Sequence, residues 1–253
     1  MRECSRITAE QWASLSQRTF YFGHQSVGAD IIEGVHEILA QRPEIKLRVV
    51  PGSSVASPGM LNEFRIGRNE DADSKNSAIV DATARALGPS PVVMFKYCYV
   101  DVHDKSDPAK LFERYRHTVA HIRTRHPGAT IVHLTIPLMA EPSLLRYVMN
   151  KVRAMATSRE ANAVRGEYNR LLRAAYAEAE PVFDLAALES TRADGTQAYG
   201  TIDGHKILAL APEWSTDGGH LNAAGRSRVA EQFLVMLAGL PLPAHEGANP
   251  PGP

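Results

Sequence analysis

Short apolar runs alternate along this chain with longer segments whose apolar residues recur every three or four positions. The short runs, each typical of a strand, occupy residues 18–22, 46–50, 92–100, 130–136 and 181–185. The longer, helix-like stripes occupy residues 27–39, 79–87, 111–122, 168–176 and 229–240. Strands alternating with helices predict a parallel sheet covered by helices on both faces. We therefore expect a doubly wound α/β fold with a five-stranded, flavodoxin-like parallel sheet, whose site lies beyond the carboxyl ends of the strands.

The pattern requires one domain, residues 1–240. Two stretches depart from the alternation of strand-like and helix-like segments. Residues 141–163 form an extra, helix-like segment, which is interpreted either as a lid over a site or as a packed surface helix. Its apolar face comprises Leu144, Leu145, Val148, Val152 and Met155. Residues 241–253 contain five prolines and are expected to be a disordered tail.

Composition narrows the function classes. The 253 residues include 28 Lys and Arg against 28 Asp and Glu, so the formal net charge is zero, which argues against a nucleic-acid binder. No run of 18 apolar residues is present, and the first residues lack the apolar core of a signal peptide. Cys4 and Cys98 are too few for a disulfide framework. We expect a cytoplasmic protein with no membrane partner.

A serine follows the first predicted strand, in the segment Tyr21–Gly28. A serine at a strand-to-helix turn presents its hydroxyl at the sheet edge, where backbone N–H groups can bind a developing oxyanion. Ser26 is therefore a candidate nucleophile, although a serine at this position also suits a helix N-cap. The segment is a poor phosphate loop, because Ala29 and Asp30 replace the lysine and hydroxyl residue of that motif.

An Asp-x-x-His pair precedes the last predicted helix, in the segment Trp214–Asn222. Asp217 and His220 are three residues apart on a turn that contains two glycines. This spacing lets one imidazole nitrogen face a serine while the carboxylate orients the ring and stabilises its charged form. A serine after the first strand together with this pair predicts a catalytic triad.

With these residues the chain resembles the SGNH (GDSL-type) hydrolase superfamily over nearly its whole length, although His24-Gln25-Ser26 stands where that family has Gly-Asp-Ser. The resemblance implies a three-layer α/β/α sandwich. It also implies Ser26 as nucleophile, His220 as general base and then acid, and Asp217 as the orienting carboxylate. An α/β-hydrolase is the less favoured alternative, because its nucleophile normally follows several strands.

The resemblance further implies three oxyanion donors: the serine N–H, a glycine after the second strand and an asparagine after the third. Gly67 is the natural candidate for the glycine. The third-strand motif is present only as Cys98-Tyr99-Val100-Asp101, in which Val100 has no donor group. Asn69 is a candidate substitute, and a loop asparagine is an equally good interpretation of it. Loss of one donor typically costs ~10²–10³ in rate.

Basic residues cluster around these predicted loops: Arg65, Arg68, Lys75 and Lys96. Lys96 interrupts an apolar run, and a buried lysine must be paired or adjoin a polar cleft. Lys96 and Arg68 are therefore candidates for binding an anionic substrate group. Ion pairing with nearby acids such as Asp71, Asp73 or Asp101 is the alternative.

Metal and cofactor sites are not expected. His117 and His121 have helical spacing, but Thr118 replaces the glutamate of His-Glu-x-x-His. His133 lies in an apolar strand and is interpreted as a core histidine, whereas His24 is left open between the site and a local hydrogen bond. The absence of Gly-x-Gly-x-x-Gly disfavours a nicotinamide or flavin enzyme.

The leading hypothesis is a serine hydrolase that cleaves a carboxylic ester through an acyl-serine intermediate. Its partner would be a small-molecule substrate bearing a short acyl or O-acetyl group, with a polar and in some cases anionic alcohol or sugar. Two alternatives stay open: an acyltransferase that uses the same acyl-serine, and a non-catalytic ligand-binding module. The sequence determines neither the alcohol nor the oligomeric state.

Overall fold

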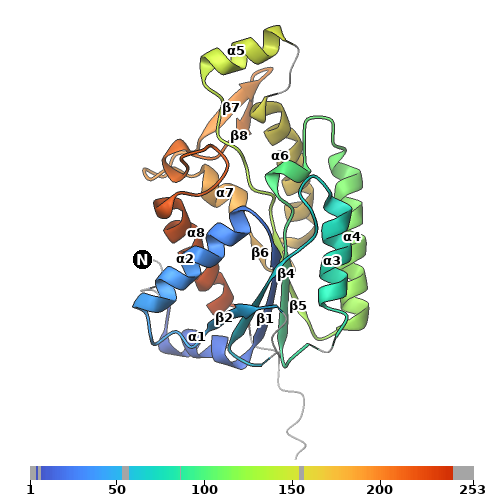
Figure 1. The fold of residues 1–253 in the computed structure, drawn as a ribbon, viewed down its shortest axis with the longest axis vertical. Coiled ribbons are helices and arrows are strands. Elements are labelled where there is room, and N and C mark those ends of the chain that lie inside the picture. The colour runs from blue at the N-terminus through green and yellow to red at the C-terminus, as the bar shows by residue number, and fades with distance from the viewer. Residues whose placement is uncertain (1–3, 5–6, 53–56, 86, 154–156, 242–253) are drawn as a thin grey trace, which may run out of the picture.

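The computed structural model describes residues 4, 7–52, 57–85, 87–153 and 157–241. Its centre is a six-stranded parallel sheet with the strand order β2-β3-β1-β4-β5-β6 (Figure 1). The strands are β1 (Thr19–His24), β2 (Arg48–Pro51), β3 (Met60–Arg65), β4 (Pro91–Phe95), β5 (Thr130–Leu134) and β6 (Val182–Phe183). The predicted fold class is confirmed.

The expected number of five strands is wrong, because the apolar pattern does not reveal β3. Its sequence, Met-Leu-Asn-Glu-Phe-Arg, places polar residues at half of its positions and so interrupts the apolar run. Asn62 is nevertheless buried in the sheet, and its amide donates to the carbonyl oxygen of Phe20 at 3.1 Å. β4 is also shorter than the apolar run 92–100, since it ends at Phe95. The residues that follow β4 are therefore loop residues at the carboxyl edge of the sheet.

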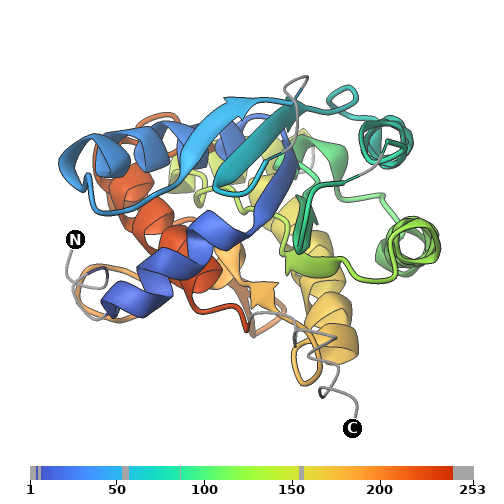
Figure 2. The same cartoon turned by 90° about the horizontal axis from the view of Figure 1, so that it is seen from below.

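Helices cover both faces of the sheet and make three layers (Figure 2). The helices are α1 (Ala9–Ser14), α2 (Val27–Gln41), α3 (Ala72–Ala82), α4 (Pro108–Arg125), α5 (Leu144–Val152), α6 (Ser158–Tyr176), α7 (Leu185–Ser190) and α8 (Ala223–Ala238). Short 3-10 turns are η2 (Leu15–Gln17), η3 (Tyr99–Asp101) and η4 (Pro212–Trp214). The five predicted helical stripes correspond to α2, α3, α4, α6 and α8.

Each face of the sheet has its own apolar core. On one face α1, α2, α7 and α8 pack through residues such as Phe22, Ile31 and Phe233. On the other face α3, α4 and α6 pack through residues such as Phe95 and Tyr115. Successive strand residues point to opposite faces, so each strand contributes to both cores. The two cores fix the strand ends from which the loops of the carboxyl edge project.

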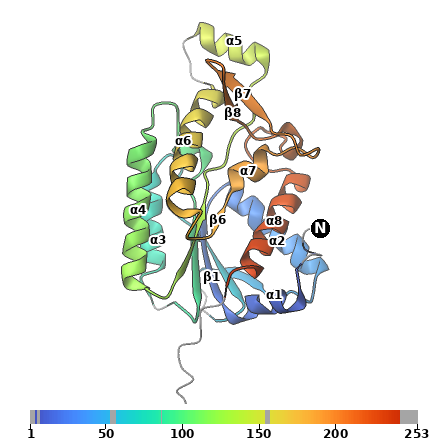
Figure 3. The same cartoon turned by 180° about the vertical axis from the view of Figure 1, so that it is seen from behind.

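The segment 141–163 begins with α5, which lies at the end of the molecule beside the hairpin of β7 (Tyr199–Ile202) and β8 (His205–Leu208) (Figure 3). The expected apolar face of the segment is largely in solvent: the exposed fractions of Leu144 and Leu145 are 79% and 72%, and Val148 is also exposed. The packed-helix interpretation is therefore wrong for α5. Met155 and residues 242–253 of the predicted tail lie outside the described residues.

Across the described ranges, no helix combines the length and apolar character needed to span a bilayer.

Candidate active site

Ser26 lies at a sharp turn between β1 and α2. Its backbone angles are φ 53° and ψ −120°, a left-handed conformation that residues other than glycine rarely adopt. The side chain does not cap α2, so the N-cap interpretation is wrong. The strained turn instead places the hydroxyl at the carboxyl edge of the sheet. Backbone strain of this kind concentrates at functional sites.

The turn that carries His220 is held by Asp217 and tied to α2. One carboxylate oxygen of Asp217 accepts from the N–H groups of Gly219 and His220, each at 2.8 Å. The next N–H, that of Leu221, donates to Asp30 of α2 at 2.9 Å. Because Asp30 lies one helical turn after Ser26, this bond fixes the histidine turn against the serine turn.

Ser26, His220 and Asp217 form one hydrogen-bonded chain, although almost 200 residues separate the serine from the other two. Ser26 Oγ lies 2.8 Å from His220 Nε2, and His220 Nδ1 lies 2.7 Å from the second Asp217 oxygen. These distances suit proton transfer from the hydroxyl to the ring and orientation of the ring by the carboxylate. The structure thus brings together the three residues predicted as a triad.

The carboxylate of Asp217 is stabilised in its charged form. The backbone N–H of His220 has the largest effect, ahead of the Gly219 N–H and the imidazole, and together they hold the pKa of Asp217 well below its usual range. An ionised Asp217 accepts the Nδ1 proton of His220, which leaves Nε2 as the acceptor for the serine proton. The charge distribution therefore selects the ring tautomer that a general base requires.

Gly67 lies in the loop after β3, next to the Ser26 turn. The Gln25 amide connects the two loops, because it donates to the carbonyl oxygens of Ile66, at 2.6 Å, and Gly67. Gly67 has φ 56°, and a Cβ there would lie 2.6 Å from the backbone nitrogen of Lys75. Within the described ranges, neither the Ser26 N–H nor the Gly67 N–H has an acceptor in the protein. Both N–H groups are free to bind a ligand oxygen.

Asn69 and Arg68 are surface residues of the same loop. Asn69 is exposed in a turn between Arg68 and Asp71, and it makes no hydrogen bond to any described residue. The Arg68 side chain is 80% exposed and pairs with Asp71 at 2.6 Å. The structure places neither side chain in contact with the triad, and Arg68 has the ion-paired role that was its alternative.

Lys96 follows the last residue of β4 and is almost completely buried, with an exposed fraction of 1%. Its Nζ donates weakly to the Tyr97 carbonyl oxygen at 3.4 Å and lies 3.8 Å from the Cys98 sulfur. The expected ion pair with Asp101 is wrong, because Asp101 pairs with buried Lys75. Lys96 therefore lies beneath the surface of the site rather than on it.

Glu189 is also fully buried, and the sequence pattern did not identify it. One of its oxygens accepts from the Leu138 N–H at 3.0 Å, and the other has no partner among the described residues. Burial raises the pKa of Glu189 to about 8, with Lys96 acting in the opposite direction. Its position in the short helix α7 gave no signal in the apolar pattern.

Tyr99, in the motif after β4, was not among the residues predicted for the site. It belongs to η3 after β4, and its ring lies edge-on to His220 with 5.8 Å between ring centroids. Asp101 fixes the turn, since it accepts from the Cys98 N–H at 2.6 Å and pairs with Lys75. The apolar character of the run 92–100 concealed this residue.

The other histidines lie outside the triad. His24 is buried and makes a local contact with Glu63 at 2.9 Å. His133 is a core histidine, as expected, with Nδ1 2.8 Å from the Tyr115 hydroxyl. His117 and His121 are exposed on α4. In the described part of the chain, no group of three or more His, Cys, Asp or Glu side chains has a geometry that suits a metal ion.

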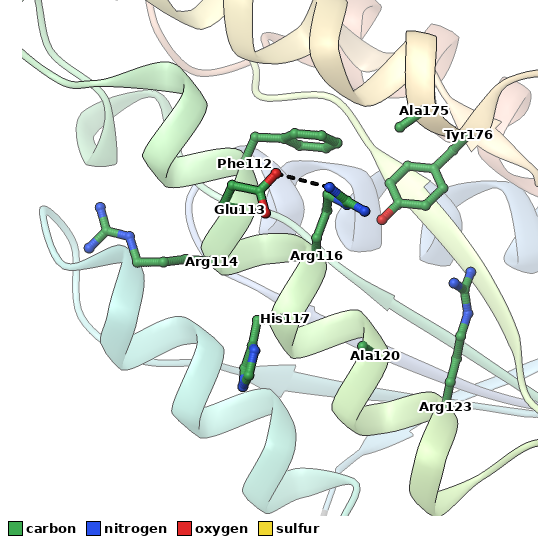
Figure 4. A pocket seen from close by; sticks show the side chains of 9 residues that line it. All are labelled: Phe112, Glu113, Arg114, Arg116, His117, Ala120, Arg123, Ala175 and Tyr176. Carbon is green, nitrogen blue, oxygen red and sulfur yellow. Dashed lines mark hydrogen bonds and ion pairs between the residues drawn. The ribbon is translucent and has the colours of Figure 1, made fainter.

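Two surface hollows are relevant to ligand binding. One, of about 520 Å³, reaches Asp217 and Gly218 of the histidine turn and continues beneath the start of α5; its other polar lining includes His103, Asp104, Glu141 and Asn150. A larger groove lies between α4 and α6 (Figure 4), and no residue of the triad lines it. Its arginines are used in ion pairs: Arg114 with Asp73, Arg116 with Glu113 and Arg123 with Glu180. Of these two hollows, only the one beside Asp217 is lined by a residue of the chain Ser26–His220–Asp217.

Comparisons with known proteins support the fold only. No family model matches the chain, and no curated protein matches it in sequence. A Bacteroides fragilis structure provisionally named an acylhydrolase aligns with a TM-score of 0.51 and 13% identity, covering 91% of this chain and 95% of that one. A Streptococcus pneumonia structure provisionally named platelet activating factor aligns with a TM-score of 0.50 and 14% identity, covering 92% and 93%. The chain thus shares its architecture with these proteins along nearly its whole length.

Proposed function

We propose that this protein is a serine hydrolase of the SGNH type that cleaves a carboxylic ester through an acyl-Ser26 intermediate. The observation that carries the proposal is the hydrogen-bonded chain Ser26–His220–Asp217 at 2.8 and 2.7 Å. The resemblance in sequence and the fold shared with a protein named acylhydrolase support the same activity.

The proposed reaction follows from the positions of the protons. As Ser26 Oγ attacks the ester carbonyl carbon, its proton passes to His220 Nε2 and the carbonyl oxygen becomes an oxyanion. The free N–H groups of Ser26 and Gly67 are the proposed backbone donors to that oxygen. His220 then protonates the leaving alcohol, and a water molecule, activated by the same nitrogen, hydrolyses the acyl-serine.

The hollow beside Asp217 favours a small, polar alcohol portion without a net negative charge. Asp104 contributes a carboxylate, and the Glu141 carboxylate is balanced by Arg159 at 2.6 Å. Neither Lys96 nor Arg68 lines this hollow. Among the described residues, the lining therefore offers hydrogen-bonding groups but no unpaired cation for an anionic substrate. A short acyl ester of a hydroxyl-rich molecule is the proposed substrate class.

A fluorophosphonate probe tests the assignment. We expect the wild type to be labelled at Ser26, as located by peptide mapping, and the Ser26→Ala variant to remain unlabelled. Ser16→Ala is the matched control, because Ser16 is an exposed serine that bonds only its own helical turn. Equal labelling of the wild type and Ser26→Ala would show that another residue is the nucleophile.

A further inference from the structure

We propose that α5, together with Tyr199 of β7, forms a surface that binds an anionic phospholipid bilayer. This binding does not depend on ester hydrolysis, so it adds a partner to the proposed function rather than a step. No membrane partner was expected from the sequence, because no run of 18 apolar residues is present. A helix that lies among the headgroups of a bilayer needs no such run.

The large apolar side chains that the protein exposes are gathered at one end of the molecule (Figure 3). Within the described ranges they all belong to α5 or to β7, and each is at least 42% exposed: Leu144, Leu145, Val148, Met149 and Tyr199. The spacing of the four α5 residues places them on one face of the helix. Apolar side chains that are exposed together in this way are typical of an interaction site. These five residues are called the α5 surface below.

Contacts on the other side of α5 hold the apolar face outward. The Arg159 guanidinium of α6 lies 4.0 Å from the centre of the Tyr147 ring, and it donates to the Thr201 carbonyl oxygen of β7 at 3.1 Å. One guanidinium therefore joins α5 to the hairpin that carries Tyr199. Asn150, also on this side of the helix, lines the hollow beside Asp217. Because α5 is held by its polar side, its apolar side is left in solvent.

The charges around the α5 surface favour an anionic partner. Residues 142–153 contain three basic residues and no acidic residue, in a chain whose formal net charge is zero: Arg146, Lys151 and Arg153. Helical spacing places positions 146 and 151 at the two borders of the apolar face. The hairpin adds Lys206, whose Nζ lies 4.3 Å from the centre of the Tyr199 ring, and one acid, Asp203. An apolar helix face with basic borders is typical of helices that lie on anionic bilayers.

A second copy of the chain suits the α5 surface less well than a bilayer does. If two such surfaces packed together, the basic borders of both copies would meet, and like charges across an interface oppose binding. An anionic bilayer instead takes up the apolar side chains and places its headgroup phosphates beside the basic residues. The surface consists of one nine-residue helix and one tyrosine, which suits a shallow contact with the headgroup region.

Co-sedimentation of the full chain with phospholipid vesicles tests the proposal. We expect binding to vesicles of phosphatidylcholine mixed with phosphatidylglycerol and weaker binding to vesicles of phosphatidylcholine alone. The difference between the two should shrink as salt is added, because salt screens the attraction between the basic residues and the headgroups. The double variant Leu144→Ser/Leu145→Ser should lower the partition coefficient for the mixed vesicles ~10-fold or more, since it removes two large apolar side chains from the contact.

A pair of arginine variants tests the charge of the surface. Arg153 is exposed at the end of α5, and Arg153→Gln should lower the partition coefficient for the mixed vesicles about fivefold. Arg170→Gln is the matched control, because it removes the same charge from an exposed arginine in α6 that pairs with Glu167. This control should bind the mixed vesicles as the wild type does.

The outcomes separate this proposal from the proposed hydrolysis. Both leucines are exposed, so the leucine variant should keep the wild-type Tm and the fluorophosphonate labelling of Ser26. No binding to the mixed vesicles, equal binding to both kinds of vesicle, or equal binding of the wild type and the leucine variant would each overturn the proposal and leave the hydrolase assignment intact. Light scattering without lipid measures the oligomeric state. A dimer that the leucine variant abolishes would overturn the proposal in favour of a second copy of the chain.

Discussion

The strained backbone at Ser26 predicts that a glycine at this position leaves the protein more stable than an alanine does. Alanine and glycine at position 26 both lose the hydrogen bond between the serine hydroxyl and His220. They differ in one respect: alanine keeps a Cβ in the conformation φ 53°, ψ −120°, whereas glycine does not. The difference in unfolding free energy between these two variants therefore isolates the backbone strain.

The expected difference in unfolding free energy between Ser26→Gly and Ser26→Ala follows from two opposing effects. A residue other than glycine in such a conformation costs ~1–3 kcal/mol. Glycine at an unstrained position costs ~0.5–1 kcal/mol relative to alanine, because its unfolded chain is more flexible. The difference predicts that Ser26→Gly is more stable than Ser26→Ala by about 1 kcal/mol, which is a factor of about five in the folding equilibrium.

Urea unfolding of the two variants at constant pH measures this difference, provided that their m-values agree. Ala120→Gly is the control, because Ala120 is exposed in the middle of α4 and glycine should there cost about 1 kcal/mol. At position 120 the protein with glycine should thus be less stable than the protein with alanine, whereas at position 26 it should be more stable. A Ser26→Gly variant no more stable than Ser26→Ala would refute the argument that this turn is strained.

Two further predictions concern stability. Glu189, whose pKa burial raises to about 8 from an ordinary 4.5, holds its proton in the folded state where the unfolded chain has lost it, so the folded state loses stability as pH rises between those values. Glu189→Gln should abolish that loss. The unfolding free energy of the variant, relative to that of the wild type, should therefore be about 2–5 kcal/mol higher at pH 8.5 than at pH 4. The prediction is contradicted if the unfolding free energies of the two proteins change with pH in the same way. Gly166 lies inside α6, and a Cβ at that position would have no other atom within 4 Å, so Gly166→Ala should raise the unfolding free energy by ~0.5–1 kcal/mol in thermal or urea unfolding. An unchanged or lowered stability would show that this position is constrained by something other than helix propensity.

Apolar periodicity was sufficient for the fold because burial of one strand face or helix stripe is a local requirement of the sequence. It failed at β3, where the Asn62 amide nitrogen donates to the Phe20 carbonyl oxygen, a partner that only the folded sheet supplies. It also failed at the end of β4, where apolar residues continue past Phe95 into a loop that is buried by tertiary contacts.

The sequence by itself determined the parallel α/β fold and identified Ser26, Asp217 and His220 as candidate site residues, because residue types and their places before or after predicted elements are local properties. Only the tertiary structure decided which other side chains accompany them. It placed Arg68 and Asn69 on the surface, Lys96 beneath the site and the Tyr99 ring against His220. The physical reason is that contacts between loops of different strands depend on sheet order and helix packing, which no local pattern encodes.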